Sequence, residues 1–252
     1  PHLERADALL TKRLGSEHRD RLPTLDLLCK AYLGTKKLAT HLSTFRDVSA
    51  IRTAVDGRVH PNTLAALQAQ ARVELIAGKK AESLATMADA RGRVERALGP
   101  DHAYAALLLA STGSLHASAG DKPEAEKLLR AATEHPSLAN GTFERQTTIA
   151  MKRTFAGFLV RSGQIDAGLR VFDMALDQAR REFGAEHLAT QQTYESAALG
   201  YLAAERFPDA IRLLRDVLRT RTAKLGPTHS QTLRTTLILA HAESLLGRID
   251  DA

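Results

Sequence analysis

Histidine is the residue type whose spacing in this sequence most suggests chemistry, because imidazole can bind a metal ion or exchange a proton near neutral pH. Five of the ten histidines recur in a regular frame, and these marker histidines are His18, His60, His102, His187 and His229. Neighbouring markers differ by 42 in residue number, except that His102 and His187 differ by 85. A metal site needs several ligands at one point, whereas one histidine per repeat spreads them along the chain. We therefore predict that each marker accepts a hydrogen bond at the start of a helix.

Cys29 is the only thiol in the sequence and hence the only candidate cysteine nucleophile. It occupies position 11 after the marker His18, and the corresponding position in each later repeat holds alanine or glycine. A position for small residues favours a buried, unreactive thiol, and a single cysteine fits a reducing compartment such as the cytoplasm. No glycine-rich phosphate loop, paired-carboxylate motif or nucleophile elbow occurs in the sequence. We therefore predict no catalytic activity, no cofactor and no metal site.

Other residues follow the frame of the marker histidines. Arg145 stands where a sixth marker is expected, so the repeat period is 42 or 43. Small residues recur at positions 11 and 23 after the marker, with His41 as an exception, and large apolar residues recur four residues after the second small position. Helices cross closely only where small residues meet, and a large side chain one turn later fills the adjoining space. The pattern predicts repeats of two helices that stack on one another.

Glycines mark the expected ends of these helices. One set lies three residues before each marker and comprises Gly15, Gly57, Gly99, Gly184 and Gly226. A second set lies at position 18 after the marker and comprises Gly78, Gly120, Gly163 and Gly247, with Glu205 at the same position of the fifth repeat. Because glycine suits the left-handed cap that ends a helix, we expect the first set to end the helix before each marker. We expect the second set to separate the two helices of each repeat.

Several repeats open with the sequence Leu-Gly-x-x-His, as at Leu14–His18, Leu98–His102 and Leu225–His229. Together with the small and large positions of the second helix, these segments resemble tetratricopeptide repeats of the kinesin light chain group. The resemblance covers essentially the whole chain, although the tryptophan typical of the first helix is absent. It implies an all-α fold, a right-handed solenoid of antiparallel helix pairs with about 12 helices.

The repeat frame predicts a single tetratricopeptide array over residues 1–252. Its repeats span about 15–56, 57–98, 99–141, 142–183 and 184–225, with partial repeats at 1–14 and 226–252. Apolar stretches such as 103–110 are far shorter than the roughly 20 residues that a membrane span needs. We therefore expect no membrane span.

The resemblance implies that the first helix of each repeat lines a concave groove that binds a protein or peptide. Positions 5, 8, 12, 15 and 16 after the marker are then expected to face the groove. The predicted partner-binding residues are Lys30, Gln68, Arg72, Leu107, Ala110, Ser114, Arg153, Arg161, Glu195 and Arg234. Basic residues outnumber acidic ones here, and the kinesin light chain group binds peptides with acidic flanks. We expect a partner with acidic residues, and an apolar side chain seated on the small, neutral surface of the third repeat.

The groove positions do not repeat their chemistry from one repeat to the next. Position 8 after the marker, where related arrays often carry an asparagine that holds the peptide backbone, has Asp26, Gln68, Ala110, Arg153, Glu195 and Leu237. This variation disfavours a base-reading array and hence nucleic acid as the partner. A separate basic stripe on one predicted second helix is made by Arg212, Arg215 and Arg219, with Arg221 and Lys224 beyond them. It is expected to be a solvated face.

The leading functional interpretation is a scaffold or sensor segment of a larger bacterial signalling or regulatory protein. In this interpretation the concave groove binds a peptide or a partner domain. The alternative is the regulatory arm of an enzyme such as a protein kinase, or of a transcription regulator, whose catalytic or DNA-binding domain lies outside this segment. The net charge of +6 permits acidic partners but does not require nucleic acid.

Overall fold

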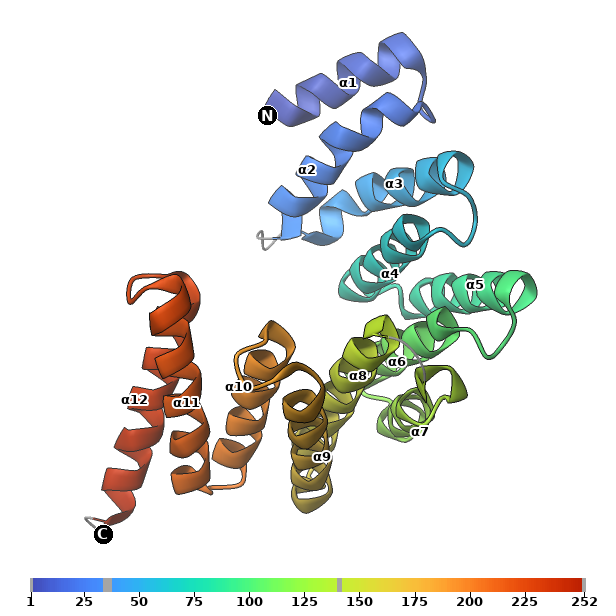
Figure 1. Cartoon of the computed structure of the whole chain (residues 1–252). Coiled ribbons are helices and arrows are strands. Elements are labelled where there is room, and N and C mark those ends of the chain that lie inside the picture. Colours follow the sequence, from blue (N-terminus) through green and yellow to red (C-terminus); the bar gives the residue numbers. More distant parts are fainter. Residues whose placement is uncertain (1, 34–37, 140–141, 251–252) are drawn as a thin grey trace. The chain divides into compact units, whose positions relative to one another are not determined.

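The computed structural model describes residues 2–33, 38–139 and 142–250, and all regular structure in these ranges is helical (Figure 1). Twelve α-helices and three short 3₁₀ helices occur in this part of the chain. The predicted all-α fold is thereby confirmed. The chain divides into two compact bodies, an N-terminal half, Pro1–Asp121, and a C-terminal half, Lys122–Ala252.

The N-terminal half contains three first helices, which are α2 (Leu22–Leu33), α4 (Pro61–Ile76) and α6 (Ala103–Ser118). The second helices between them are α3 (Leu42–Val55) and α5 (Lys80–Leu98), and α1 (His2–Leu14) precedes α2. Two 3₁₀ helices, Arg19–Arg21 and Leu38–His41, lead into α2 and α3. Each of these α-helices packs against its neighbours in the chain (Figure 1).

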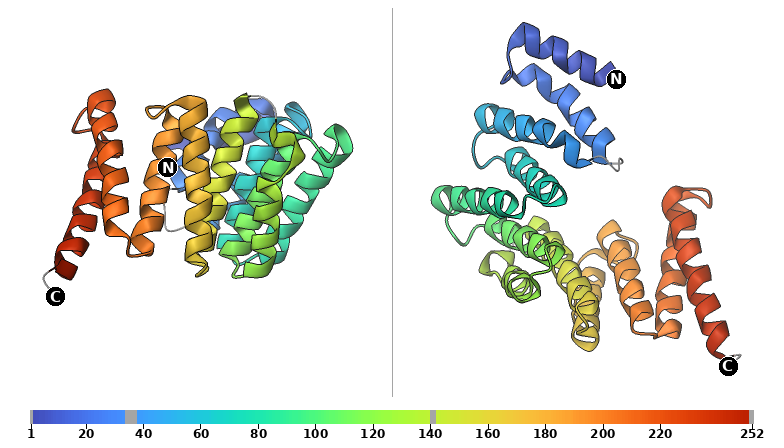
Figure 2. Two further views of the ribbon diagram at one scale, coloured as in Figure 1. Left: turned by 60° about the horizontal axis from the view of Figure 1, so that its bottom comes forward. Right: turned by 180° about the vertical axis from the view of Figure 1, so that it is seen from behind.

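The C-terminal half has the first helices α8 (Thr142–Arg161), α10 (Leu188–Ala203) and α12 (Ser230–Asp250). Its second helices are α7 (Lys122–Thr133), α9 (Ile165–Phe183) and α11 (Phe207–Leu225), and the 3₁₀ helix Pro136–Ala139 connects α7 to α8. Each of α8 to α12 packs against the next helix in the chain, and the left view of Figure 2 shows this order.

The small and large positions of the repeat frame meet in the core. Ala71 and Ala156, at the first small position, have no exposed surface, and Phe172, at the large position, is 2% exposed. Gly168 of α9 lies at the second small position and packs closely against α8. A Cβ on Gly168 would lie 2.6 Å from the Val160 side chain and 2.9 Å from the Ala156 carbonyl oxygen. The packing therefore requires the small residue that the frame predicted.

Each marker histidine accepts a hydrogen bond through Nδ1 from the backbone N–H two residues later. The donors are the N–H groups of Asp20, Asn62, Tyr104, Ala189 and Gln231, at 3.1 to 3.3 Å. The predicted capping role is confirmed. In the repeat without a marker, His135 accepts the same bond from the Ser137 N–H at the start of a 3₁₀ helix. Arg145 lies inside α8, where it pairs with Glu182 at 3.8 Å.

The glycines before the markers all have positive φ, between 80° and 102°. Positive φ agrees with the predicted left-handed cap, but the ψ angles differ from it. Gly99, Gly184 and Gly226 have ψ of 160° to 166°. These values lie in an extended region that is essentially restricted to glycine, rather than in the left-handed helical region.

Glycines of the second set end α4, α6 and α8 with positive φ, and they are Gly78, Gly120 and Gly163. Glu205 takes the same place after α10 with a φ of 59°, which is costly for a residue with a Cβ. The prediction for Gly247 is wrong, because α12 continues through it to Asp250. A glycine inside a helix costs only about 1 kcal/mol relative to alanine, so Gly247 alone does not end α12.

Candidate partner-binding clefts

The N-terminal half has a cleft of about 520 Å³ between its first helices α4 and α6, here called the α4/α6 cleft. Gln68 and Arg72 line it from α4 and Ser114 lines it from α6, so three predicted groove residues lie together. Met87 from α5 lines its buried base. Gln68 Nε2 donates to Ser111 Oγ at 3.1 Å, which joins the two helices, and the Arg72 side chain is exposed.

The C-terminal half has a cleft of about 450 Å³ between α8 and α10, the α8/α10 cleft. Arg153 and Arg161, both predicted groove residues, line it from α8. Arg153 is partly buried, and its Nη1 donates to Gln192 Oε1 at 3.1 Å. Burial lowers the pKa of the Arg153 guanidinium from its ordinary value, and the Glu195 carboxylate opposes this shift. The α8/α10 cleft thus holds two guanidinium groups.

Two glycines that the repeat frame did not single out shape the α8/α10 cleft. A Cβ on Gly157 would lie 3.1 Å from Arg161 Nη1, so the glycine lets this guanidinium lie over the backbone of α8. A Cβ on Gly200 would lie 2.8 Å from the Phe172 ring, so the glycine lets the ring pack beneath α10. Gly157 follows the small position Ala156, and Gly200 lies two residues after the small position Ala198. The repeat pattern predicts a small residue only at Ala156 and Ala198, so it does not indicate the two glycines.

The two clefts occupy the same place in the repeat. Adding 85 to the number of any residue that lines the α4/α6 cleft, except Ala65, gives a residue that lines the α8/α10 cleft. Gln68 thus corresponds to Arg153, and Met87 corresponds to Phe172. None of the described residues that line either cleft is acidic. One repeat frame therefore builds two equivalent clefts whose charged side chains are arginines.

Residues 147–223 match the family model described as tetratricopeptide repeat. This segment of the chain therefore contains tetratricopeptide repeats. The fold is similar to a solved structure of a variant of a Podosopora anserina protein, described as a putative kinesin light chain with nearly identical TPR-like repeats. The two chains are 18% identical with a TM-score of 0.60, and the match covers 83% of this chain and 98% of that chain. BtubC, also called BKLC, from P. vanneervenii is similar at 13% identity and a TM-score of 0.66, covering 84% of this chain and 85% of that chain.

No curated protein sequence matches this tetratricopeptide array. At such low identities the two solved structures show the fold. Together with the match of residues 147–223, they support the predicted all-α fold of tetratricopeptide-type helix pairs.

The other predicted groove residues of the tetratricopeptide array do not line the two clefts. Lys30 is exposed on α2. On α6, Leu107 is partly buried and Ala110 is buried, and their carbonyl oxygens accept hydrogen bonds from Ser111 Oγ and Ser114 Oγ at 3.0 and 2.9 Å. The backbone of these two residues therefore holds the side chains of Ser111 and Ser114, which line the α4/α6 cleft.

Glu195 and Arg234 are brought together by α10 and α12. Glu195 is 8% exposed, and its Oε1 lies 3.0 Å from Arg234 Nη2. Its Oε2 lies 2.6 Å from Nη1 of Arg221, a residue of α11 that is buried although the sequence predicts it to lie on the solvated basic stripe. An arginine in a stretch of basic residues indicates a surface position, and only its carboxylate partner on another helix explains its burial.

The basic stripe on α11 is neutralised by neighbouring carboxylates. Its exposed arginines pair as Arg212 with Asp209, Arg215 with Glu243 and Arg219 with Asp216, at 3.6, 2.8 and 3.2 Å. These three arginines agree with the predicted solvated face, whereas the prediction is wrong for Arg221, which is buried against Glu195. Within the described ranges, no group of three or more histidine, cysteine or acidic residues is placed to hold a metal ion. No described helix combines the length and apolarity needed to cross a membrane.

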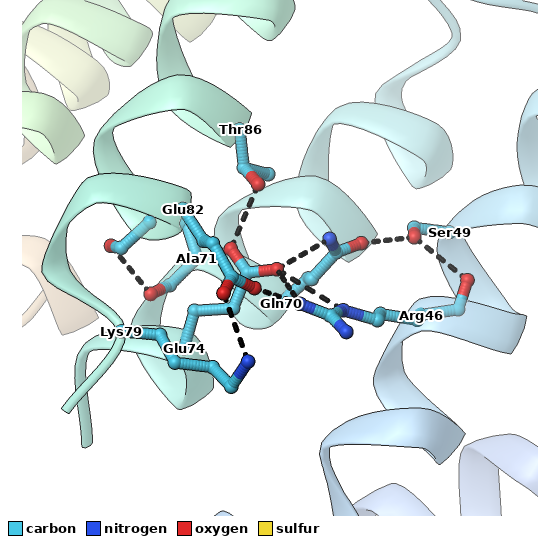
Figure 3. Close-up of polar contacts among 9 residues, drawn as sticks. Arg46, Ser49, Gln70, Ala71, Glu74, Lys79, Glu82 and Thr86 are labelled. Carbon is cyan, nitrogen blue, oxygen red and sulfur yellow. Dashed lines mark hydrogen bonds and ion pairs between the residues drawn. The ribbon is translucent and has the colours of Figure 1, made fainter. Parts of the chain in front are cut away.

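A buried carboxylate anchors α4, the helix that carries Gln68 and Arg72. Glu74 is 1% exposed and lies between Arg46 of α3, Gln70 of α4 and Thr86 of α5 (Figure 3). Gln70 Nε2 and Thr86 Oγ1 donate to it at 2.9 and 2.8 Å, and Arg46 Nη2 donates at 3.2 Å. Because every partner comes from a different turn or helix, this network fixes the rotation of α4 about its axis.

Proposed function

We propose that this tetratricopeptide array is an interaction module that binds acidic segments of a partner protein in the α4/α6 and α8/α10 clefts. The single observation that carries the proposal is the lining of these equivalent clefts. Arginine supplies their charge, namely Arg72 in one and Arg153 and Arg161 in the other, and no described lining residue is acidic.

The α8/α10 cleft offers the stronger attraction for an anion. A carboxylate accepts two parallel hydrogen bonds from a guanidinium group, which gives both energy and a defined orientation. Arg153 is partly removed from water, and its Nη1 donates to the neutral amide of Gln192. A partner carboxylate near Arg153 would meet a charge that the surrounding protein screens less than water does.

Both clefts also present apolar surface beside the arginines. Ile76 of the α4/α6 cleft is 56% exposed, and Leu199 of the α8/α10 cleft is 43% exposed. Burial of apolar surface contributes about 25 cal/mol per Å². An acidic segment that also carries an apolar side chain therefore fits the clefts better than one with carboxylates alone.

We place this module in a larger signalling or regulatory protein, in bacteria and in the cytoplasm. The single cysteine of the sequence, Cys29, suits a reducing compartment. Partial burial raises the pKa of its thiol to about 11, which suits an unreactive side chain. The proposal assigns no catalytic step to the chain.

The test is binding of a fluorescent peptide in which glutamates surround one leucine, measured by anisotropy. Arg153→Glu with Arg161→Glu should weaken binding at least tenfold, because an attraction of about 1.4 kcal/mol or more is replaced by repulsion. Arg212→Glu with Arg219→Glu on the neutralised stripe of α11 changes the net charge equally and should leave affinity within about twofold. Equal losses in the two double variants, or no loss in the first, would contradict the proposal.

A further inference from the structure

A polar contact recurs between successive first helices of the C-terminal half. Arg153 of α8 contacts Gln192 of α10, and Glu195 of α10 contacts Arg234 of α12, at 3.1 and 3.0 Å. Both contacts join position 8 of one repeat to position 5 of the next, and both span 39 residues. In the first contact the arginine meets a neutral amide, whereas in the second it meets a carboxylate.

Glu195 holds two arginines with very different exposure. The side chain of Arg221 is 7% exposed and that of Arg234 is 66% exposed, whereas that of Glu195 is 10% exposed. Arg221 has further support, because its Nη1 also donates to Thr235 Oγ1 at 2.7 Å. Arg234 contacts Glu195 from the solvent side. The Glu195 carboxylate therefore pairs with an arginine that, like those of the clefts, lies at a predicted groove position of a first helix.

The N-terminal half has a counterpart of the buried pair Glu195–Arg221 but none of the exposed pair Glu195–Arg234 among its described residues. Asp26 and Arg52 occupy the positions of Glu195 and Arg221 and lie 2.6 Å apart. Arg52 is also held by Asp56 at 3.1 Å. The two acidic residues at position 8 therefore differ in that Glu195 also pairs with a groove arginine of the next first helix.

We propose that Glu195 determines which groove arginines are open to an acidic partner. It acts as an internal carboxylate that occupies Arg234, so that acidic segments are directed to Arg153 and Arg161 of the α8/α10 cleft. This inference rests on the proposed function of that cleft. A partner carboxylate has to compete with Glu195, whose attachment to the same fold gives it a high effective concentration at Arg234.

The experiment removes the charge of Glu195 and retains its shape. Glu195→Gln gives α10 and α12 the arginine and amide combination that α8 and α10 already have. Affinity for the same labelled peptide should rise about tenfold, because one more guanidinium group becomes available. The rise should shrink as salt is added, since the regained charge is largely exposed.

Asp26→Asn is the matched control, because it changes the net charge by the same amount at the same repeat position. Arg52 keeps Asp56 as a partner, so this variant should gain no affinity. Adding Arg234→Gln to Glu195→Gln should abolish the gain. A folded Glu195→Gln protein with wild-type affinity, a gain that survives Arg234→Gln, or an equal gain in Asp26→Asn overturns the inference.

Glu195→Gln leaves Arg221 without its carboxylate, so its melting curve is recorded first. Arg234→Gln alone gives an independent test if that variant does not fold. Because Glu195 already occupies Arg234, the single change should leave affinity for the peptide unaltered, and a loss of tenfold overturns the inference. If wild type depends on Arg153 and Arg161 but these tests fail, only the role of Glu195 is wrong; if no variant binds the peptide, the proposed function is wrong as well.

Discussion

The α4/α6 and α8/α10 clefts differ in where their charge lies, although the helices that form them carry the same frame. The first has Arg72 in the C-terminal half of α4, where the second has Gly157. The second has arginines at 153 and 161, eight residues or about 12 Å apart along α8. The difference teaches that the repeat frame fixes the helix packing, while the charged residues that line a cleft can differ from one pair of repeats to another.

The supports of the two clefts differ as well. Glu74 in α4 and Leu159 in α8 occupy corresponding positions, and both are almost fully buried. Glu74 is acceptable there because Arg46, Gln70 and Thr86 satisfy its oxygens. The same buried position of the repeat therefore accepts either an apolar side chain or a fully hydrogen-bonded carboxylate.

The largest expected effect concerns the bases of the clefts. Phe172→Ala should lower the free energy of unfolding by about 3–5 kcal/mol, because the missing ring leaves a cavity under α10. Met87→Ala, the counterpart in the N-terminal half, should cost about 2–5 kcal/mol. Urea unfolding followed by circular dichroism measures both. A loss below about 1 kcal/mol for Phe172→Ala would show that this ring does not support the α8/α10 cleft.

The helix caps were predictable from the sequence because they depend on neighbours in the chain. A marker histidine and the N–H that it accepts are two residues apart, and the spacing of small residues reports the crossing of paired helices directly. The pairing of Glu195 with Arg221 and Arg234 was not predictable in the same way. It depends on the rotation of α10, α11 and α12 relative to one another, which the hydrophobic pattern specifies only to within a broad face.

The ends of the first helices show the same limit. Gly78 and Gly163 end their helices as predicted, but Gly247 does not, although all three occupy the same repeat position. Glycine permits a left-handed residue without requiring one. Glu205 shows the converse, since it adopts positive φ without being glycine.

A smaller effect is expected at Glu205, the counterpart of Gly120 in the N-terminal half. Glu205→Gly should raise the free energy of unfolding by about 0.5–1 kcal/mol, because glycine adopts a φ of 59° without a Cβ clash. Glu205→Ala keeps the Cβ and should give no such gain. Thermal unfolding of the two variants decides the matter, and equal stabilities would show that the backbone at this position carries no strain.

The most direct test of the account is to map where an acidic peptide binds. Backbone amide NMR signals of the isotope-labelled chain are followed as the glutamate-rich peptide with one leucine is added. The account predicts the largest changes at the cleft residues, with Gly157, Ser196 and Gly200 as reporters of the α8/α10 cleft and Ser114 of the α4/α6 cleft. Changes confined to α11 around Arg212 and Arg219, with the cleft signals unmoved, would contradict it.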